Sequence, residues 1–591
     1  MGSANHASKD PSGWPHAPRD ASGRRVLFIN PPSIPYNALV RIFERRYEPL
    51  VQTIAMPMGI LYLASTLERD LPGIGIDIVD LAKEYRELCE CGQLQFHSFD
   101  EFCEEMLRSK VRNAPTLIGI SVLFSTAHKS TLRIAAVCKQ RWPDVPVVVG
   151  GMHATNAVEQ LLESPSIDYV CRGEGEAIIA DLVLAPSADI QGIVSRANLG
   201  AKRSAPLIYN LDTIPLPAWH LIPMEEYIFS AISRAKNLDK IEQDGAATIV
   251  TTRGCPFHCT FCASWTVHGR EMRYRSTENV ISELKILRER YGVHTVIPED
   301  DLFSVKKPRF IDLCDAIYQE FGGQLHFQFP NGLSVATLDA EVIAAMKRMG
   351  MTVANIAIES GSNEVQRKII KKNVNLERAR NVVAECRNQG VTARAYFILG
   401  FPGETRSQME ETIEFAASLE ADWCTVHPAA PLAGTEMFDQ LVARGDIDRS
   451  FNWDDAFFQE RTYDTAEIGA QELKDLAYGA NLRINFFENY NLRSGQYEKA
   501  IELFLDILRA YPSHLAARIC LAKAYEQTGK SELAQEAFAK ARELVESRAP
   551  MAIEQVARFP RLFPWFANPD QVELSKQGPR PGLPTAARAT I

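Results

Sequence analysis

Three cysteines share one short loop, Cys255-Pro-Phe-His-Cys259-Thr-Phe-Cys262. Thiolates are the usual ligands of iron–sulfur clusters, and the usual set has four cysteines. Three thiolates at this spacing can hold three irons of a cubane cluster, which leaves the fourth iron without a protein ligand. Because an iron with an open position can bind a substrate, the loop predicts chemistry as well as electron transfer.

Zinc is the simpler alternative for clustered cysteines. A closed structural zinc site needs four ligands, normally from two Cys-x-x-Cys knuckles or from a Cys/His pair further along the chain. This chain has no second knuckle, and His258 lies between two of the cysteines, where it would be hard to close around the same ion. We therefore favour a cluster over zinc.

Length and composition describe a multidomain chain with an ordinary core. Its 591 residues exceed what one core can organise, and 46% of them are hydrophobic. With a net charge of −10 and no dense basic run, the chain carries no signature of a nucleic-acid partner. We see neither a signal peptide nor an apolar stretch of membrane-spanning length, so we expect a cytoplasmic protein.

Residues 24–190 alternate short apolar runs with helical patterns, which predicts a parallel, doubly wound sheet covered on both faces. The expected strands are 26–29, 75–79, 117–122, 145–149 and 168–170. Ligands of such sheets bind beyond the carboxyl ends of the strands. The candidate binding residues at those ends are Ser121, Ser125, Thr126, Gly150, Gly151, His153, Gly173 and Glu174.

A second run of strands and helices occupies residues 244–440, after a proline-rich linker in 191–243. The expected strands are 247–252, 295–297, 325–329, 353–358, 392–399 and 423–427. The cysteine loop follows the first of them. The fold class is therefore α/β, with two successive strand–helix domains.

The spacing Cys-x3-Cys-x2-Cys, with Phe261 just before the last cysteine, resembles the signature of the radical S-adenosylmethionine (radical SAM) superfamily. The resemblance implies a partial (β/α)6 barrel over residues 244–440 and a [4Fe-4S] cluster on Cys255, Cys259 and Cys262. It also implies that S-adenosylmethionine binds at the open iron and is cleaved reductively to methionine and a 5′-deoxyadenosyl radical. The electron would come from a donor such as flavodoxin or ferredoxin.

Matching strand ends to this superfamily implies further contacts to S-adenosylmethionine. Phe261 and Gly400 would meet the adenine, Asp300 or Asp301 the methionine amino group, Glu359 the ribose and Arg394 the methionine carboxylate. Each has a structural alternative: a solvated loop for the aspartates, a helix cap for Glu359 and a surface salt bridge for Arg394. Cys424 is a candidate thiol donor or second-site ligand, although a buried structural cysteine is the simpler interpretation.

Three segments of the first domain, Pro57 to Leu63, Gly150 to His153 and Arg172 to Glu176, resemble the cobalamin-binding domain that precedes many radical SAM barrels. The Asp-x-His-x-x-Gly motif that supplies a histidine to cobalt is absent, so neither His128 nor His153 is assigned as a cobalt ligand. With cobalamin, the resemblance implies methylation of an unactivated carbon or phosphorus of a small molecule.

Other outcomes stay open. Relatives with this architecture also act as cyclases, oxidases or ring-contracting enzymes without net methyl transfer. A transfer-RNA methylthiotransferase fits less well, because that group resembles a different N-terminal domain with its own cysteine triad. The alternative from another class is an iron–sulfur scaffold that recruits a protein partner through helical repeats.

Those repeats lie in the helical region 441–548. Five residues recur at an offset of 34: Gly495, Glu498, Ala500, Glu502 and Phe504 match Gly529, Glu532, Ala534, Glu536 and Phe538. This is the tetratricopeptide period, and two copies at about 491–545 are fewer than a free-standing array needs. We expect them to dock on the catalytic domain or a partner, with a disordered N-terminus at 1–23 and a tail at 549–591.

Overall fold

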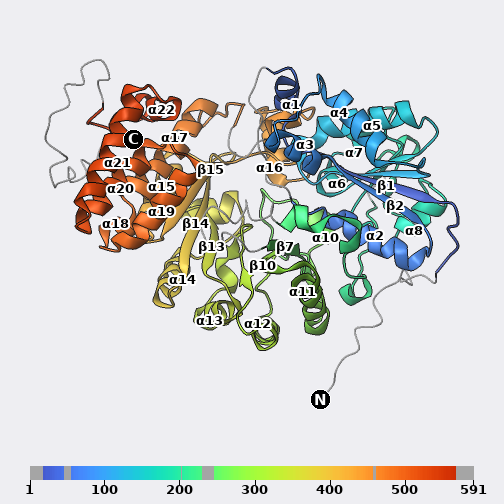
Figure 1. Ribbon diagram of the computed structural model, residues 1–591, viewed down its shortest axis with the longest axis horizontal. Coiled ribbons are helices and arrows are strands. Elements are labelled where there is room, and N and C mark those ends of the chain that lie inside the picture. The colour runs from blue at the N-terminus through green and yellow to red at the C-terminus, as the bar shows by residue number, and fades with distance from the viewer. Residues whose placement is uncertain (1–17, 46–54, 201–202, 229–244, 457–460, 567–591) are drawn as a thin grey trace. The chain divides into compact units, whose positions relative to one another are not determined.

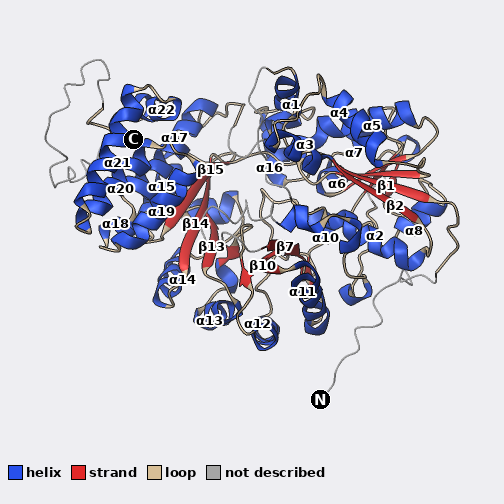
Figure 2. Cartoon of the chain, in the orientation of Figure 1, coloured by secondary structure: helices blue, strands red, loops and turns tan. Residues whose placement is uncertain are grey.

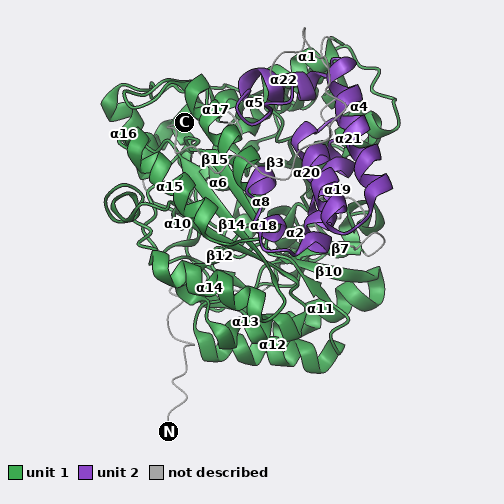
Figure 3. Cartoon of the chain, turned by 90° about the vertical axis from the view of Figure 1, so that its left-hand side faces the viewer, with its two compact units in different colours: residues 1–484 green, residues 485–591 purple. Residues whose placement is uncertain are grey.

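The computed structural model describes residues 18–45, 55–200, 203–228, 245–456 and 461–566. The chain forms two compact units, residues 1–484 and residues 485–591 (Figures 1 and 3). Most of the predicted disordered ends lie outside the described residues. The tail prediction is wrong for residues 550–558, because α22 (Pro550–Arg558) forms there.

The first unit begins with the predicted doubly wound sheet, whose strand order is β2-β1-β3-β4-β5-β6. The pairs are parallel except for β5 with β6, which is antiparallel. The strands are β1 (Arg25–Asn30), β2 (Gly75–Asp80), β3 (Leu117–Ser121), β4 (Val147–Gly150), β5 (Tyr169–Cys171) and β6 (Ile193–Val194).

Helices cover both faces of this sheet, because alternate residues of each strand point to opposite sides. In β1, Leu27 and Ile29 join one apolar core, whereas Val26 and Phe28 join the other. One core includes α1 (Tyr36–Phe43), α3 (Leu81–Glu90), α4 (Phe99–Lys110), α5 (His128–Arg141) and α7 (Val158–Leu162). The other includes α2 (Met58–Asp70) and α8 (Ile179–Leu184).

The second run of strands forms two parallel sheets, in the orders β11-β10-β7 and β12-β13-β14-β15 (Figure 2). Six of the seven strands correspond to the six that the sequence predicts. The strands are β7 (Gly245–Ile249), β10 (Val293–Pro298), β11 (His326–Phe327), β12 (Leu333–Ser334), β13 (Val353–Glu359), β14 (Thr392–Leu399) and β15 (Trp423–Pro428).

A helical layer packs against one side of these strands and shares one large apolar core with them. In β13, Ala354, Ile356 and Ile358 face this layer, so Asn355 and Glu359 face the opposite side. The layer contains α11 (Thr277–Tyr291), α12 (Lys307–Phe321), α13 (Ala340–Met349), α14 (Leu376–Asn388), α15 (Arg406–Ser418) and α17 (Ala470–Leu482). This is the predicted β/α barrel-like arrangement.

The second unit is helical throughout its described part: α18 (Tyr490–Arg493), α19 (Tyr497–Ala510), α20 (Leu515–Gln527), α21 (Ser531–Glu546) and α22. The 34-residue repeat is visible in its turns, since Gly495 and Gly529 both adopt positive φ, 80° and 73°. Ala500 and Ala534 are buried at equivalent positions. Among the described residues, no helix combines the length and apolarity needed to span a membrane.

The repeat-equivalent phenylalanines of this unit differ in burial, which gives a stability prediction. Phe504 is completely buried and stacks on Phe486 at 5.7 Å, whereas Phe538 is only partly buried. Phe504→Ala should lower the free energy of unfolding of the helical unit by about 3–5 kcal/mol, the usual cost of such a cavity. Phe538→Ala is the matched control, and urea unfolding followed by circular dichroism should show less than half that loss. Equal losses would contradict the assignment of Phe504 to the core.

Candidate cofactor site

The cysteine loop lies between two short antiparallel strands, β8 (Thr252–Arg253) and β9 (Arg273–Tyr274). Cys255, Cys259 and Cys262 are all half-buried. The Cys255 amide donates to the Gly269 carbonyl (3.3 Å), which closes the loop near its base. In the middle of the loop, the Thr260 amide donates to the Ile370 carbonyl (3.0 Å), so the loop is anchored to the barrel.

The three thiols fit the cluster that the sequence implies. Burial raises the pKa of Cys259 to about 12 and raises the pKa of Cys255 above its ordinary value. A bound metal reverses this preference because it deprotonates its thiol ligands outright. Across the described residues, no three His, Cys, Asp or Glu side chains lie close enough to hold one ion. Each ligand of a cubane cluster binds a different iron.

Asp300 and Asp301, which follow β10, support the base of the cysteine loop. Asp300 Oδ1 accepts hydrogen bonds from the Thr251 amide (2.9 Å), the Thr251 hydroxyl (3.0 Å) and the Thr252 amide. Asp301 Oδ2 accepts from the Gly254 amide at 3.3 Å. The solvated-loop alternative is therefore wrong for Asp300, whose burial raises its pKa to about 6.

Asp300 also keeps one oxygen available. Its Oδ2 is buried and has no hydrogen-bond partner among the described residues. A buried polar atom without a partner is costly, and such atoms mark places where a ligand is missing. The predicted contact with the methionine amino group stays a prediction, and Oδ2 is the atom that would make it.

Glu359 ends β13 with a strained backbone. Its φ of 71° is in the left-handed region, which non-glycine residues rarely adopt except where the surroundings enforce it. Its buried carboxylate accepts a hydrogen bond from Lys372 Nζ at 2.7 Å, and the same ammonium group donates to the Ala357 carbonyl at 2.8 Å. Sequence reasoning missed Lys372, because it stands in an unremarkable run of basic residues. The predicted ribose contact of Glu359 is untested.

Phe261 and Gly400 come together through a second buried carboxylate. The Phe261 ring lies 5.6 Å from the Phe401 ring, next to Gly400. Glu404 Oε2 accepts hydrogen bonds from the amides of Gly400 (2.6 Å) and Phe401 (3.0 Å), and burial raises its pKa to about 8. Glu404 thus closes this turn, while Thr405 and not Glu404 caps the following helix.

The structure does not support two other assignments. Arg394 lies five residues before the end of β14, about 16 Å from the strand ends beside the cysteine loop, and is opposite Asn355 and Trp423. It is 5% exposed, so the surface salt bridge is wrong as well. Cys424 faces the helical layer, with Sγ 3.7 Å from the Ala416 carbonyl, because it alternates with inward-facing neighbours. It is the buried structural cysteine.

The carboxyl ends of β3 and β4 form a compact edge of the first sheet. Ser121 pairs in register with Gly150, and Gly151 adopts a φ of 106°. A Cβ at Gly151 would lie 2.6 Å from the Val122 carbonyl oxygen, so only glycine fits there. Leu123 and Phe124 are 55% and 44% exposed beside this edge. Such a bare, apolar edge fits a large, flat, ring-shaped ligand like cobalamin.

Behind that edge, polar side chains form a buried chain. Ser125 Oγ lies 3.0 Å from His153 Nδ1, and His153 Nε2 lies 2.9 Å from His128 Nδ1. Thr126 donates to the Ser33 carbonyl at 2.6 Å. Both ring nitrogens of His153 are therefore committed to protein partners. The structure supports no cobalamin contact for the His153 side chain.

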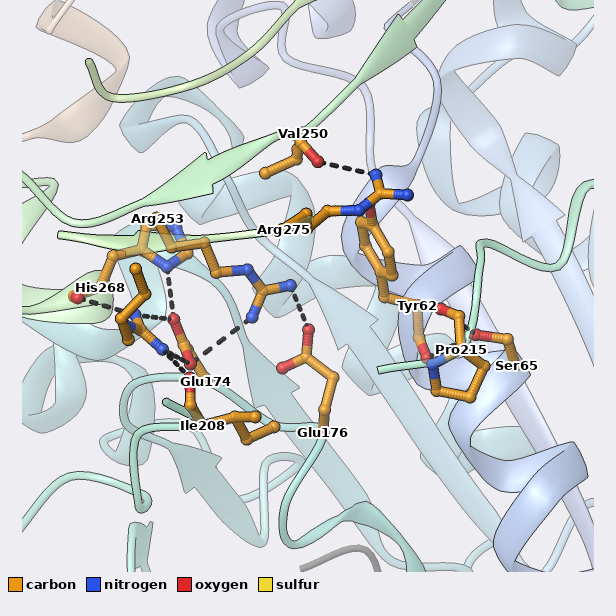
Figure 4. A network of polar contacts seen from close by, with 11 residues as sticks. Tyr62, Ser65, Glu174, Glu176, Ile208, Pro215, Val250, Arg253, His268 and Arg275 are labelled. Carbon is orange, nitrogen blue, oxygen red and sulfur yellow. Dashed lines mark hydrogen bonds and ion pairs between the residues drawn. The ribbon is translucent and has the colours of Figure 1, made fainter. Parts of the chain in front are cut away.

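Glu174 likewise has a different role from the predicted one. Its side chain is completely buried and accepts hydrogen bonds from Arg273 (2.5 and 2.8 Å) and from His268 Nδ1 (2.8 Å) (Figure 4). Its carboxylate is thus not available to cobalamin. Gly173, with a φ of 85°, donates its amide to Thr155 Oγ1 at 3.0 Å.

Comparison with known proteins agrees with this geometry. Residues 249–416 match the model of the radical SAM superfamily, and residues 51–183 match that of the B12 binding domain. An uncharacterized methyltransferase of Pyrococcus horikoshii is 30% identical over 73% of this chain and 85% of its own length. The cytidylyl-2-hydroxyethylphosphonate methyltransferase of Streptomyces wedmorensis is 26% identical over 74% and 86%.

Two solved structures share the fold. The cobalamin-dependent S-adenosylmethionine radical enzyme OxsB, with aqua-cobalamin and S-adenosylmethionine bound, aligns with a TM-score of 0.58 at 16% identity. It covers 91% of this chain and 81% of its own. The radical S-adenosylmethionine methyltransferase TsrM of Kitasatospora setae aligns with a TM-score of 0.54 at 18% identity, over 71% and 75%.

The buried histidines predict how stability depends on pH. Burial lowers the pKa of His128 to about 4 and that of His153 well below its ordinary value. The unfolded chain therefore binds more protons between about pH 6.5 and pH 4, and the folded state loses stability as the pH falls through that range. In His153→Gln the melting temperature should fall less steeply with acid. His220→Gln, at an exposed position, is the control and should keep the wild-type slope.

Proposed function

The chain belongs to the radical SAM superfamily enzymes that carry a cobalamin-binding domain, and from that premise we propose that it methylates an unactivated carbon or phosphorus of a small molecule. Its cofactors are a [4Fe-4S] cluster, S-adenosylmethionine and cobalamin. The two relatives that it resembles over three quarters of its length are both named methyltransferases. A hopanoid C-3 methylase of Methylococcus capsulatus is 26% identical over 67% of the chain.

One observation carries the proposal: the two loops that would hold the cofactors are neighbours. Helix α6 (Met152–Asn156) begins at the glycine edge of the first sheet, and α10 (Trp265–His268) begins three residues after Cys262. Asn156 Nδ2 donates to Thr266 Oγ1 at 2.9 Å, which joins the two helices. The edge that fits cobalamin and the cysteine loop thus belong to one site.

The chain's own residues position and enclose the reacting groups. When bound, the cluster and cobalamin supply the electron that cleaves S-adenosylmethionine and the methyl group that is transferred. Cys255, Cys259 and Cys262 would hold three irons, while Asp300 fixes the loop from below. Phe261, packed on Phe401, closes one side of the site against water.

The electron donor belongs to the proposal as well. We infer that a small protein carrier such as flavodoxin or ferredoxin reduces the cluster, and that the reaction takes place in the cytoplasm, where thiols stay reduced. The helical repeats offer a surface for a further protein partner.

A second candidate function is cyclisation without net methyl transfer. An anaerobic magnesium-protoporphyrin IX monomethyl ester cyclase of Rubrivivax gelatinosus is 25% identical over 58% of this chain and 61% of its own length. The mass of the product separates the two, because only methylation adds a methyl group. A scaffold without catalytic activity would release no 5′-deoxyadenosine from S-adenosylmethionine.

Removing one cluster ligand tests the enzyme assignment. In anaerobically reconstituted protein, Cys259→Ala should lose the absorbance of the [4Fe-4S] cluster and reduce dithionite-driven 5′-deoxyadenosine formation to background, because two thiolates cannot hold the cubane. The matched control is Cys424→Ala, which removes a thiol from the helical layer and should keep both signals. Undiminished 5′-deoxyadenosine formation in Cys259→Ala would overturn the proposal.

The free oxygen of Asp300 makes a second prediction. Asp300→Asn keeps an acceptor for the threonine amides but removes the negative charge, so the iron content should stay at the wild-type level. A lost hydrogen bond to a charged ligand costs about 1.5–3 kcal/mol, which corresponds to roughly 10- to 150-fold weaker binding of S-adenosylmethionine. Equilibrium binding to the reconstituted protein measures this. Unchanged affinity would assign Asp300 to the support of the loop alone.

A further inference from the structure

The turn after β5 meets the strands that flank the cysteine loop through a buried ionic network (Figure 4). Glu174 binds Arg273 and His268 as described above. Glu176 accepts a hydrogen bond from Arg253 Nη2 at 2.6 Å, and Arg253 Nη1 lies 3.5 Å from Glu174. Two carboxylates from the domain that matches the B12 binding model thus hold three cationic or histidine side chains of the barrel.

These partners occupy the base of the cysteine loop. Arg253 and Arg273 pair in register across β8 and β9, so their side chains are neighbours at the point where the loop begins and ends. Arg253 is two residues before Cys255. His268 is followed by Gly269, whose carbonyl accepts the Cys255 amide. The two carboxylates therefore hold both ends of the segment that carries all three cysteines.

Burial makes this network specific. Side-chain exposure is 0% for Glu174, 2% for Arg273 and 7% for both Arg253 and Glu176. A buried ion pair adds little net stability compared with apolar packing, because its charges have lost their water. Breaking it by removing one partner is costly, and guanidinium–carboxylate pairs demand a defined geometry. The network therefore specifies a position more than it adds stability.

The surroundings leave little room for movement. The Tyr62 ring lies 5.4 Å from the guanidinium of Arg253. A Cβ at Gly175, between the two glutamates, would lie 3.0 Å from the Leu63 side chain. The adjoining cavity, lined by Tyr62, Arg253 and Arg275, has a volume of about 10 Å³, room for about one water molecule. A shift of either domain would have to break the ionic contacts.

We propose that Glu174 and Glu176 are positioning residues that set the separation between the bound cobalamin and the bound cluster. They do so by fixing the base of the cysteine loop to the turn after β5, close to the sheet edge that fits cobalamin. The inference rests on the proposed function, because it needs both cofactors in the same chain. Neither glutamate touches substrate or cofactor in this scheme.

The experiment compares Glu174→Gln with Glu283→Gln. Glu283 forms an equally buried ion pair with Arg275, but both residues belong to the barrel, so this variant breaks a buried pair without releasing the first sheet. The probes are cob(II)alamin and the dithionite-reduced cluster, which are both paramagnetic in the reconstituted full chain. Their magnetic dipolar coupling, measured by pulsed electron paramagnetic resonance, reports the distance between them.

Wild-type protein and Glu283→Gln should give one narrow distance distribution, and Glu174→Gln should give a broader or shifted one at similar iron and cobalamin content. Glu176→Gln, which removes only the contact to Arg253, should give a smaller change and serves if Glu174→Gln does not fold. Hydrogen exchange of residues 254–272 should rise in Glu174→Gln and stay unchanged in Glu283→Gln.

Two results would contradict the inference in different ways. If the wild type shows a defined distance that both Glu174→Gln and Glu176→Gln retain, the positioning role is wrong and the proposed function stands. If the wild-type chain binds neither cofactor, the proposed function fails and the inference fails with it.

Discussion

The buried pairing of Glu174 with Arg273 and His268 is the constraint on which the rest of the site depends. Charges without water need partners at defined distances, so the turn after β5 and the base of the cysteine loop have one favourable arrangement. That arrangement places α6 against α10 and brings the glycine edge of the first sheet to the cysteine loop. The chemistry of a two-cofactor enzyme requires this proximity.

Buried carboxylates recur around the site with a common task. Asp300 fixes the residues before the cysteine loop, and Glu404 fixes the turn whose Phe401 packs on Phe261. Both have a raised pKa because burial disfavours their charged form. The loop between strands thus gains the rigidity that a short, irregular segment lacks by itself, since backbone amides find fixed acceptors.

Sequence reasoning recovered the fold and the cluster ligands, and it was less reliable for charged side chains. The α/β strands were predictable because their apolar runs and the glycines at their ends are local patterns. Glu174 and His153 were both placed correctly at strand ends, yet their side chains bind protein partners instead of an open edge. Arg394 lies too far down its strand, and Cys424 points to the helices because side chains alternate along β15.

The sequence alone determined the ligand set, because three cysteines within eight residues are close in any fold, and it determined the order of strands and helices through apolar periodicity. Only the tertiary structure decided which groups bind one another. Glu174 and Arg273 are separated by 99 residues, and no local pattern pairs them. Their contact depends on how two sheets pack, and burial then decides that each charge has a single partner available.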